Sequence, residues 1–386
     1  MNSYSDIPLA SVLKILKTNA SKSFDKATPV PPEVNHSHEF YFHEKNKVFL
    51  KEWICVGRED EIPAAGDYLT HQIADVPVLV VRQNSNEIIS FVNACAHRFT
   101  CLVPKLKGNT RAFTCRYHGW TYDLRGTLKR APFMEMKKDF DLNKHSLFPL
   151  HTQIWEGFIY VTATKNPKKS IADALNGFSE KIVGRYNMSG YKTVMRESMV
   201  WDANWKNLIE NFIESYHVPI AHQKTFAKHK KLIEDYVCGE DNDHYCYHYA
   251  PQKSEIGAGA AHPKNTTLKA EWRRMMVDFC VFPNHLVTLM PDYLWYISVQ
   301  PISISQFRAT WGFAVPSEIL ADVSQKDYDI WLSNMYNYME IANNEDKVLV
   351  EGLFKGSSSP IVPKGTLHPI ERNIWQFIKY LNYICQ

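Results

Sequence analysis

The chain has 386 residues, 45% of them hydrophobic, and a formal net charge of +3. A net charge this small for the length does not indicate binding to nucleic acid or another polyanion. No apolar run approaches the ~20 residues that a membrane-spanning helix needs. The eight cysteines lack the spacing of a disulfide scaffold, which suits a reducing compartment and predicts a cytoplasmic protein.

The first half of the chain is predicted to pass from a helix to short strands. Residues 39–53 alternate aromatic or aliphatic side chains with charged ones and are predicted as a helix. Further along, β-branched and aromatic runs at 78–81, 88–92 and 157–161 predict strands, and 122–126 predicts a tight turn. We therefore expect a small all-β domain in this part of the chain.

The second half follows a polar stretch at 165–169, which is a candidate linker. Apolar side chains at helical spacing predict helices over 170–186, 205–221 and 327–353, whereas residues 243–316 are strand-like. The order of helix, strands and helix predicts a second domain with an antiparallel sheet, so the expected fold class is α+β.

The most specific motif lies in the predicted all-β domain. Cys95 and His97 are separated by seventeen residues from Cys115 and His118, in the pattern C-x-H-x17-C-x2-H. This is the spacing of a Rieske centre, where two thiolates hold one iron of a [2Fe–2S] cluster and two imidazoles hold the other. A structural zinc site is the alternative, because zinc also takes Cys and His. The second pair contains no cysteine to bridge to Cys101, so the centre resembles those of oxygenases and their ferredoxins.

A second candidate metal site lies in the predicted helix 205–221. His217 and His222 are five residues apart, about 140° around an ideal helix, which is too far for one metal ion. Pro219 between them removes a backbone donor and should distort the helix, so that both imidazoles could meet. Two histidines and one carboxylate form the facial triad of non-haem Fe(II) oxygenases. The predicted carboxylate comes from the late helix, where Asp346 is preferred over the alternatives Glu345 and Glu340.

With these motifs the chain resembles the catalytic α subunit of a Rieske non-haem iron oxygenase over nearly its whole length. The resemblance implies a Rieske domain at 45–162, a helix-grip catalytic domain at 163–386, and an N-terminal helical segment at 1–44 that packs on the catalytic domain. It also implies a [2Fe–2S] cluster and a mononuclear Fe(II). Such subunits form head-to-tail homotrimers, in which the cluster of one subunit serves the iron of its neighbour because the two centres within one chain are too far apart.

By the same resemblance, Glu214 takes the place of an acidic residue that bridges the two centres between subunits, and Asn211 belongs to the catalytic motif before it. The bridging residue is usually Asp. A Glu resembles the branch that acts on quaternary ammonium compounds such as glycine betaine, carnitine and choline. That branch carries Glu-Cys-Tyr-His-Cys, whereas this chain has Ser215 and Val218 at the cysteine positions.

The activity that follows from the resemblance is hydroxylation of a small organic substrate with O2, with loss of formaldehyde when the carbon is an N-methyl group. Electrons are expected from NAD(P)H through a separate reductase with flavin and iron–sulfur centres, or through a ferredoxin. Two alternatives stay open. One is an α subunit that hydroxylates aromatic rings or aromatic carboxylates, and the other is an electron-transfer Rieske protein without oxygenase activity.

Aromatic side chains on the predicted strands are candidates for a substrate pocket. They could surround a trimethylammonium group through cation–π contact, or an aromatic ring, and strand alternation lets only some of them point inward. The candidates are Trp272, Phe279, Tyr293, Trp295 and Tyr296. Three cations that could bind a substrate carboxylate are Lys206, Arg273 and Arg274. Three further polar residues, expected to be structural, are His244, Cys246 and His248.

Overall fold

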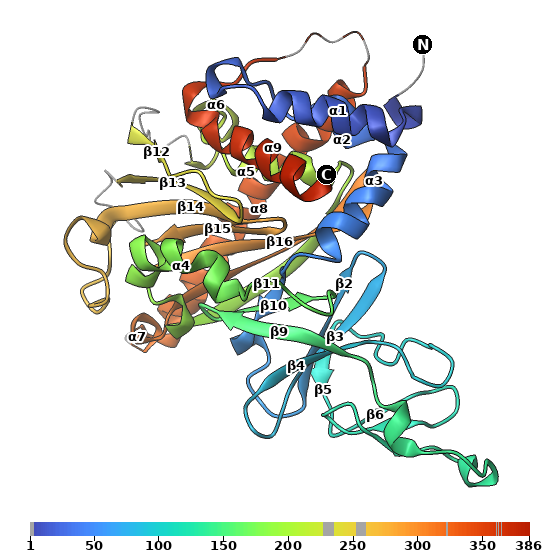
Figure 1. The fold of residues 1–386 in the computed structure, drawn as a ribbon. Helices are drawn as coiled ribbons and strands as arrows, with labels where there is room; N and C mark the ends of the chain where they lie inside the picture. The colour runs from blue at the N-terminus through green and yellow to red at the C-terminus, as the bar shows by residue number, and fades with distance from the viewer. Residues whose placement is uncertain are drawn as a thin grey trace. The chain divides into compact units, whose positions relative to one another are not determined.

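The computed structural model describes residues 4–226, 235–251, 260–321, 323–359, 361, 363 and 365–386. The chain divides into two compact units, Phe49–Asp173 and Met1–Val48 with Ala174–Gln386. Each unit contains one large antiparallel sheet (Figure 1). Helices and sheets together confirm the predicted α+β fold. The finer division at 44/45 and 162/163 stays a proposal.

The regular structure of the smaller unit is mostly short β-strands. Its seven-stranded sheet has the order β1-β10-β9-β4-β3-β2-β5, and a separate three-stranded sheet has the order β6-β7-β8. The predicted strands at 78–81, 88–92 and 157–161 are confirmed by β3, β4 and β10. The strands are β1 Ile54–Arg58, β2 Asp67–Ile73, β3 Val76–Arg82, β4 Ile88–Val92, β5 Lys107–Asn109, β6 Phe113–Thr114, β7 Thr121–Tyr122, β8 Leu128–Arg130, β9 Pro149–Trp155 and β10 Phe158–Thr162.

The predicted tight turn between β7 and β8 is also confirmed. Asp123 accepts backbone N–H bonds from Arg125 and Thr127 through its side chain, each at 2.9 Å. Gly126 follows with φ +76°, and a Cβ there would lie 2.6 Å from the Phe91 ring. Only glycine satisfies both the left-handed backbone and this close approach.

The larger unit is built on a second seven-stranded sheet, in the order β11-β17-β16-β15-β14-β13-β12. All its neighbouring strands are antiparallel, which confirms the strand-like character predicted for 243–316. The part of that region at 252–259 lies outside the described residues. The strands are β11 Tyr191–Trp201, β12 Val237–Cys238, β13 Tyr245–Pro251, β14 Met275–Val281, β15 His285–Met290, β16 Tyr293–Ser303 and β17 Gln306–Pro316.

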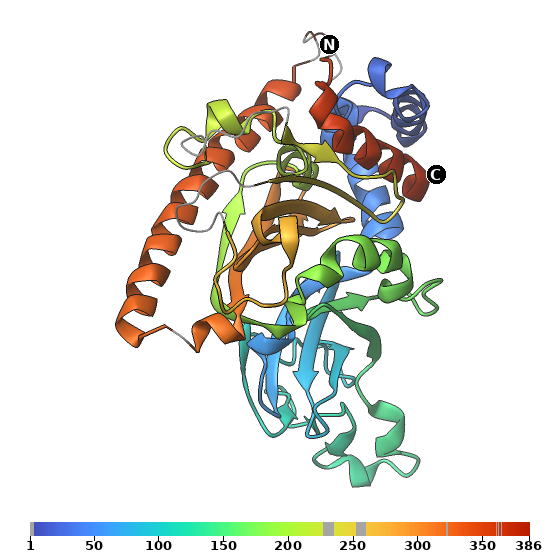
Figure 2. The same ribbon diagram turned by 90° about the vertical axis from the view of Figure 1, so that its left-hand side faces the viewer.

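Helices cover both faces of this sheet (Figures 1 and 2). On one face, Phe178 of α4 contacts the ring of Phe279 at a centroid distance of 5.0 Å. On the other, Phe212 of α5 lies 5.8 Å from the Trp295 ring, and Tyr336 of α8 lies 6.2 Å from the Trp311 ring. The helices are α1 Leu9–Ala20, α2 Pro32–His36, α3 His38–Glu44, α4 Ile171–Lys181, α5 Trp205–Phe212, α6 Val218–Ala221, α7 Ser317–Leu320, α8 Gln325–Ser357 and α9 Arg372–Cys385.

Three of the predicted helices are confirmed with shifted ends. The first comprises α3 and a π-helical turn at Lys45–Phe49, so it ends before Trp53. The second comprises α4 and a 3₁₀ turn at Val183–Arg185, and the third lies within α8. None of the described helices is long and apolar enough to cross a membrane.

The continuous helix predicted over 205–221 is wrong. The chain leaves the helix after Phe212 and starts a new one at Val218. At the break, the Glu214 carboxylate accepts the backbone N–H groups of Tyr216 and His217. The side chain of Asn373 donates to the Ile213 carbonyl at 3.0 Å. Polar side chains therefore satisfy the backbone groups that a continuing helix would have paired.

The N-terminal segment packs on the C-terminal helix α9. Phe24 contacts Trp375 at a ring-centroid distance of 5.9 Å, and the Trp375 indole N–H donates to the Lys22 carbonyl at 3.1 Å. A ring nitrogen of His43 also lies 2.6 Å from the Cys385 carbonyl oxygen. These contacts support the proposal that residues 1–44 form a segment of the catalytic part.

Candidate functional site

The loops that carry the Rieske motif share one backbone turn. Cys95 accepts a hydrogen bond from the N–H of residue 99 and donates its own N–H to the carbonyl of Thr100, both at 2.9 Å. Cys115 repeats this pattern with residue 119 at 3.0 Å and with Trp120 at 2.8 Å. Residue 99 is Phe with φ +61°, and residue 119 is Gly with φ +73°. The two ligand loops of the motif therefore have the same backbone hydrogen-bond pattern.

The four motif side chains are placed as a [2Fe–2S] cluster requires. Cys95 and Cys115 are buried side by side under the loops, while the rings of His97 and His118 lie 4.5 Å apart. His97 stacks on Trp120, and its buried Nδ1 has no hydrogen-bond partner among the described residues. An orphaned, buried imidazole nitrogen fits a metal ligand. His118 is exposed, which leaves the histidine side of the site open to an electron partner.

Tyr122 also belongs to this site, although sequence reasoning missed it. Its hydroxyl lies 3.2 Å from the Cys95 sulfur and accepts the Ala96 N–H at 3.0 Å. Because the backbone N–H already occupies the oxygen as an acceptor, the hydroxyl proton is available to a Cys95 thiolate. The only signal in the sequence was the position of Tyr122 four residues after the second ligand pair.

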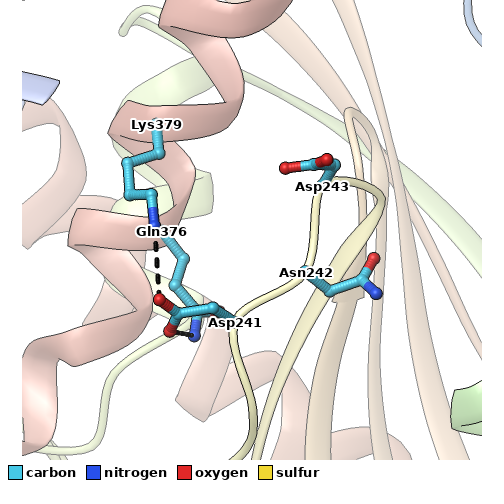
Figure 3. A pocket seen from close by; sticks show the side chains of 5 residues that line it. All are labelled: Asp241, Asn242, Asp243, Gln376 and Lys379. Carbon is cyan, nitrogen blue, oxygen red and sulfur yellow. Dashed lines mark hydrogen bonds and ion pairs between the residues drawn. The ribbon is translucent and has the colours of Figure 1, made fainter.

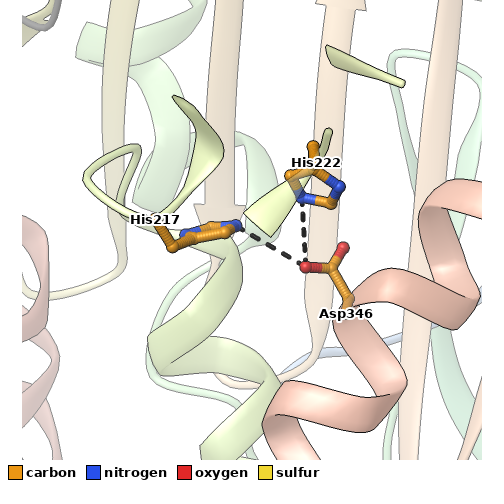
Figure 4. Close-up of side chains that lie close together, drawn as sticks. All are labelled: His217, His222 and Asp346. Atoms are coloured by element: carbon orange, nitrogen blue, oxygen red, sulfur yellow. Dashed lines mark ion pairs between the residues drawn. The ribbon is translucent and has the colours of Figure 1, made fainter. Parts of the chain in front are cut away.

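The second site brings together the three predicted iron ligands, His217, His222 and Asp346 (Figure 4). One ligand atom from each lies within 4.8 Å of the others. The Nε2 atoms of His217 and His222 are 3.5 and 3.2 Å from the same Asp346 oxygen. The predicted Asn211 joins them, since its amide donates to that oxygen at 3.3 Å. This geometry fits the two-histidine, one-carboxylate set for iron.

Each of the two imidazoles is also held from behind by a carboxylate. Glu214 bonds to Nδ1 of His217, and Glu345 lies 3.0 Å from Nδ1 of His222. Glu345 is fixed in turn by Thr225 at 2.6 Å and by the backbone N–H of residue 224 at 3.0 Å. Glu345 therefore orients a ligand rather than supplying one, and the other alternative, Glu340, is exposed to solvent. With both Nδ1 atoms engaged, both Nε2 atoms are left for a metal ion.

The charges of the triad are strongly coupled. Burial alone would lower the pKa of His217, but hydrogen bonds to Asp346 and Glu214 raise it to about 10. Burial would raise the pKa of Asp346, but hydrogen bonds from His217 and His222 lower it to about 2. These opposite shifts mark a centre of negative charge that suits a cation.

The predicted aromatic pocket residues separate onto the two faces of the sheet. Tyr293 and Trp295 lie on the face that α5 and α8 cover, where the triad is. Phe279 and Tyr296 lie on the opposite face, with α4, because Tyr296 is the strand neighbour of Trp295 and Phe279 is in register with Tyr296 through Val287. Trp272 is also away from the triad, against Tyr186. Strand alternation therefore places Phe279 and Tyr296 away from the triad, and Trp272 lies in the 3₁₀ turn before β14.

The three candidate cations are engaged elsewhere. Lys206 is fully buried and pairs with Glu44 at 2.6 Å. Arg273 donates to the carbonyls of Asn265 and Ala261 at 2.6 and 2.7 Å, and Arg274 follows it in the 3₁₀ turn before β14. Among the described residues, His244, Cys246 and His248 belong to no group that could hold a metal ion.

A surface pocket of about 180 Å³ lies between the loop before β13 and helix α9 (Figure 3). Asp241 in this pocket pairs with Arg372 at 2.7 Å and with Lys379 at 3.2 Å. Because Asp241 and Lys379 pair with each other and none of the lining residues belongs to the triad, we interpret this pocket as a structural feature.

Two family models match the two parts of the chain. The Rieske [2Fe–2S] domain matches residues 52–145, and the ring hydroxylating alpha subunit (catalytic domain) matches residues 188–386. The chain therefore carries a Rieske cluster and a mononuclear iron, and the zinc alternative is excluded.

Two curated relatives are oxygenase subunits. The carnitine monooxygenase oxygenase subunit of Escherichia coli (strain K12) is 31% identical over 350 residues, which cover 89% of this chain and 88% of the relative. The glycine betaine monooxygenase oxygenase subunit of Chromohalobacter salexigens is 40% identical over 179 residues. That second match covers 46% of this chain and 40% of the relative.

Solved structures share the fold. A quaternary ammonium Rieske monooxygenase in complex with L-carnitine matches with a TM-score of 0.78 and 23% identity, over 94% of this chain and 97% of the other. Naphthalene 1,2-dioxygenase from Rhodococcus sp., bound to indole, matches with a TM-score of 0.82 and 20% identity, over 97% and 98%. At this level of identity the fold is common to enzymes of different substrates.

Proposed function

The chain belongs to the family of ring-hydroxylating alpha subunits, and from that membership we propose that it is the oxygenase component of a monooxygenase acting on a quaternary ammonium compound. The observation that carries the proposal is the triad of His217, His222 and Asp346, each imidazole supported by its own carboxylate. A pure electron-transfer protein has no use for such a centre. The preference for a quaternary ammonium substrate is supported by the carnitine and glycine betaine relatives.

The bound cluster and iron supply one-electron transfer and activation of O2. The residues around them fix geometry and charge. Asp346 faces the Nε2 atoms of both histidines, so these three side chains would hold the iron. Glu214 and Glu345 hold the imidazole tautomers by accepting the Nδ1 protons. Asn211 keeps the Asp346 carboxylate turned toward the histidines.

The reaction inserts one oxygen atom of O2 into a C–H bond of the substrate, and the other atom leaves as water with two electrons and two protons. When the carbon is an N-methyl group, the hydroxymethyl ammonium product breaks its C–N bond. The products are then formaldehyde, the demethylated amine and a proton.

The proposed partners are a second and third copy of this chain and a reductase that draws electrons from NAD(P)H, directly or through a ferredoxin. Both metal sites lie beside exposed apolar side chains, which commonly mark interaction surfaces. Phe99 and Tyr117 of the cluster loops are 83% and 55% exposed. Tyr216 and Ile220 beside the iron ligands are 48% and 78% exposed. In a head-to-tail homotrimer these surfaces would meet, with Glu214 as the bridge for the electron.

A cytoplasmic location completes the proposal, since NAD(P)H and a reducing environment are available there. Cell fractionation tests this point, and recovery with the periplasmic or membrane fraction would contradict it.

The test of the activity is product formation with a surrogate reductase and NADH. We expect oxygenated product or formaldehyde, in proportion to NADH, from at least one of choline, glycine betaine and L-carnitine. The Asp346→Ala variant should form none. Product from naphthalene or aromatic acids, with none from the ammonium compounds, would replace the proposed substrate class and keep the oxygenase.

A further inference from the structure

The two histidines of the cluster motif have different aromatic neighbours. The ring of exposed His118 lies 3.9 Å from the ring of Tyr117, on the surface that is proposed to meet a neighbouring copy of the chain. The ring of His97 instead stacks on the buried Trp120, at 4.8 Å and an interplanar angle of 10°. The cluster site therefore has a second side, which leads through His97 into the smaller unit.

Trp120 connects His97 with the surface of the smaller unit. Its ring lies 5.6 Å from the ring of His145 and 5.5 Å from that of Phe140, and these two rings are 4.7 Å apart. His145 ends the 3₁₀ turn Leu142–His145 and is partly exposed. Two ring contacts, from His97 to Trp120 and from Trp120 to His145, thus lead from a cluster ligand to solvent.

The turn Leu142–His145 is part of a surface with three exposed cations. It contacts strand β8, which ends at Arg130. Soon after the turn, the Leu147 N–H donates to the Gly126 carbonyl at 2.8 Å, between β7 and β8. The backbone thus brings three exposed side chains into one region, which we call the basic surface: Arg125, Arg130 and Lys144.

The charges of the basic surface are not neutralised within the described part of the chain. None of its three side chains forms an ion pair with another described residue. Nearby, Asp123 pairs with Lys129 at 3.2 Å. Asp141 accepts the Asn143 N–H at 3.0 Å and so caps the turn. The stretch 135–139 holds two exposed carboxylates and two exposed lysines, whose charges balance. A positive charge therefore remains on the basic surface.

Exposed apolar side chains accompany these cations. Leu142 is 37% exposed and Phe148 is 55% exposed, at the start of the turn and shortly after it. Apolar side chains that are bordered by charged ones are typical of a surface that binds another protein. Attraction between opposite charges raises the association rate of such a complex by about 10–10³-fold.

We propose that the basic surface docks an acidic [2Fe–2S] protein, the ferredoxin or the iron–sulfur domain of the reductase, and that the electron enters the cluster on the His97 side. This inference rests on the proposed function, in which a partner protein reduces the cluster. Each encounter moves one electron: the donor is oxidised, the cluster is reduced, and no covalent bond changes. The transfer is downhill, because plant-type ferredoxins have lower potentials than Rieske centres.

The first test is stopped-flow reduction of the oxidised holoenzyme by an acidic plant-type [2Fe–2S] ferredoxin that has been reduced beforehand. The triple variant Arg125→Glu/Arg130→Glu/Lys144→Glu reverses the charge of the basic surface. We expect the second-order rate constant for cluster reduction at low salt to fall about tenfold or more, and its decrease with added salt to disappear. Iron content and the Rieske absorbance establish that each variant is loaded.

The matched control reverses three exposed lysines of the larger unit, in the variant Lys14→Glu/Lys17→Glu/Lys192→Glu. It has the same net charge as the test variant, and it should keep most of the wild-type rate constant and its dependence on salt. Equal losses in the two variants would assign the effect to net charge and overturn the inference.

Light scattering distinguishes the proposed donor from a neighbouring copy of the chain as the occupant of the basic surface. We expect the test variant to have the oligomeric state of the wild type. A test variant that dissociates would place the basic surface at a contact between subunits and overturn the inference.

A second variant, Phe148→Ala, removes exposed apolar area and leaves every charge in place. It should lower the rate constant several-fold at each salt concentration and keep the wild-type dependence on salt. An unchanged rate constant would contradict docking at this surface.

Failure of this inference and failure of the proposed function are separate outcomes. Reduction of the wild-type cluster at a rate independent of salt, or no reduction by the ferredoxin, would overturn the inference. Product formation after photochemical reduction of the holoenzyme would then leave the proposed function standing. A holoenzyme that the ferredoxin reduces in a salt-dependent way, but that oxidises no substrate, would contradict the proposed function and keep the docking surface.

Discussion

The two metal sites differ in how far apart their residues lie in the sequence. All four cluster residues lie between Cys95 and His118, on two loops that repeat one turn. The iron site joins a break between two short helices to the middle of α8, more than a hundred residues later. A local motif can be recognised by spacing alone, whereas an assembled site depends on the fold of the whole unit. The following changes should separate these two cases.

The largest effect is expected from Asp346→Ala, which removes the shared carboxylate. We expect loss of bound iron and a decrease in turnover of more than about 100-fold, because two imidazoles alone hold iron poorly. The Rieske absorbance should stay intact, since no cluster residue is touched. Iron analysis and the visible spectrum of the same sample measure both. Loss of both chromophore and iron would mean that the two sites do not fold independently.

Glu345→Gln should have a smaller effect on the same site. It removes the charge behind His222 and keeps the side-chain shape, so we expect iron affinity to fall about 10–100-fold. Iron retention during dialysis against a chelator measures this change. Exposed Glu340 on the same helix gives the matched control Glu340→Gln, which should retain iron as the wild type does. Equal retention in both variants would show that Glu345 does not support the ligand.

The buried Glu210 lies in helix α5, which leads to the iron site, and its ionisation should make stability depend on pH. Burial raises its pKa to about 8, against which a hydrogen bond from the residue 30 N–H and the charge of Lys206 act weakly. Between about pH 4.5 and 8 the unfolded chain loses this proton and the folded chain keeps it. The free energy of unfolding should therefore fall as pH rises through this window, by at most about 1.4 kcal/mol per pH unit from this group.

Glu210→Gln should remove that contribution and leave the protein more stable than the wild type at pH 8. Denaturant unfolding at pH 6 and pH 8 measures the slope, with Glu318→Gln as an exposed control. A slope that is the same in Glu210→Gln and the wild type would contradict a raised pKa.

The smallest effect belongs to the local site. Tyr122→Phe removes the hydroxyl 3.2 Å from the Cys95 sulfur. One hydrogen bond to a thiolate is worth about 1 kcal/mol, so the midpoint potential should fall by roughly 40 mV for one electron. Redox titration followed by the Rieske absorbance measures it. An unchanged potential would show that the hydroxyl serves only the Ala96 N–H.

The same contrast explains which features the sequence could predict. Cys95, His97, Cys115 and His118 were predictable because hairpin loops fix their separation. The chemistry of an iron site predicted His217, His222 and Asp346. The break in the helix that brings the two histidines together was not predicted. The apolar pattern continues through Ile213, but the helix ends before it, where Glu214 and Asn373 take the backbone groups that a helix would have paired.

The pocket residues show a second limit of sequence reasoning. Alternation along a strand predicts that neighbours point to opposite faces, but it does not tell which face carries the metal. Trp295 and Tyr296 are neighbours that point to opposite faces, and the contact of Trp295 with Phe212 places Trp295 on the face of the triad. Glu345 was an alternative iron ligand in the sequence, and its position behind His222 could not be predicted because the two residues are distant in sequence.

The left-handed turns of the two cluster loops are occupied by different residues, Phe99 in one and Gly119 in the other. Gly119 adopts this conformation without strain, whereas Phe99 does so at a cost of about 1–2 kcal/mol. Phe133 repeats the arrangement, with φ +61° and 75% exposure. A mutation of either phenylalanine to glycine would relieve the backbone and hide an apolar ring from water. In the proposed homotrimer, burial of these rings against a neighbouring subunit would offset the backbone cost that each monomer bears.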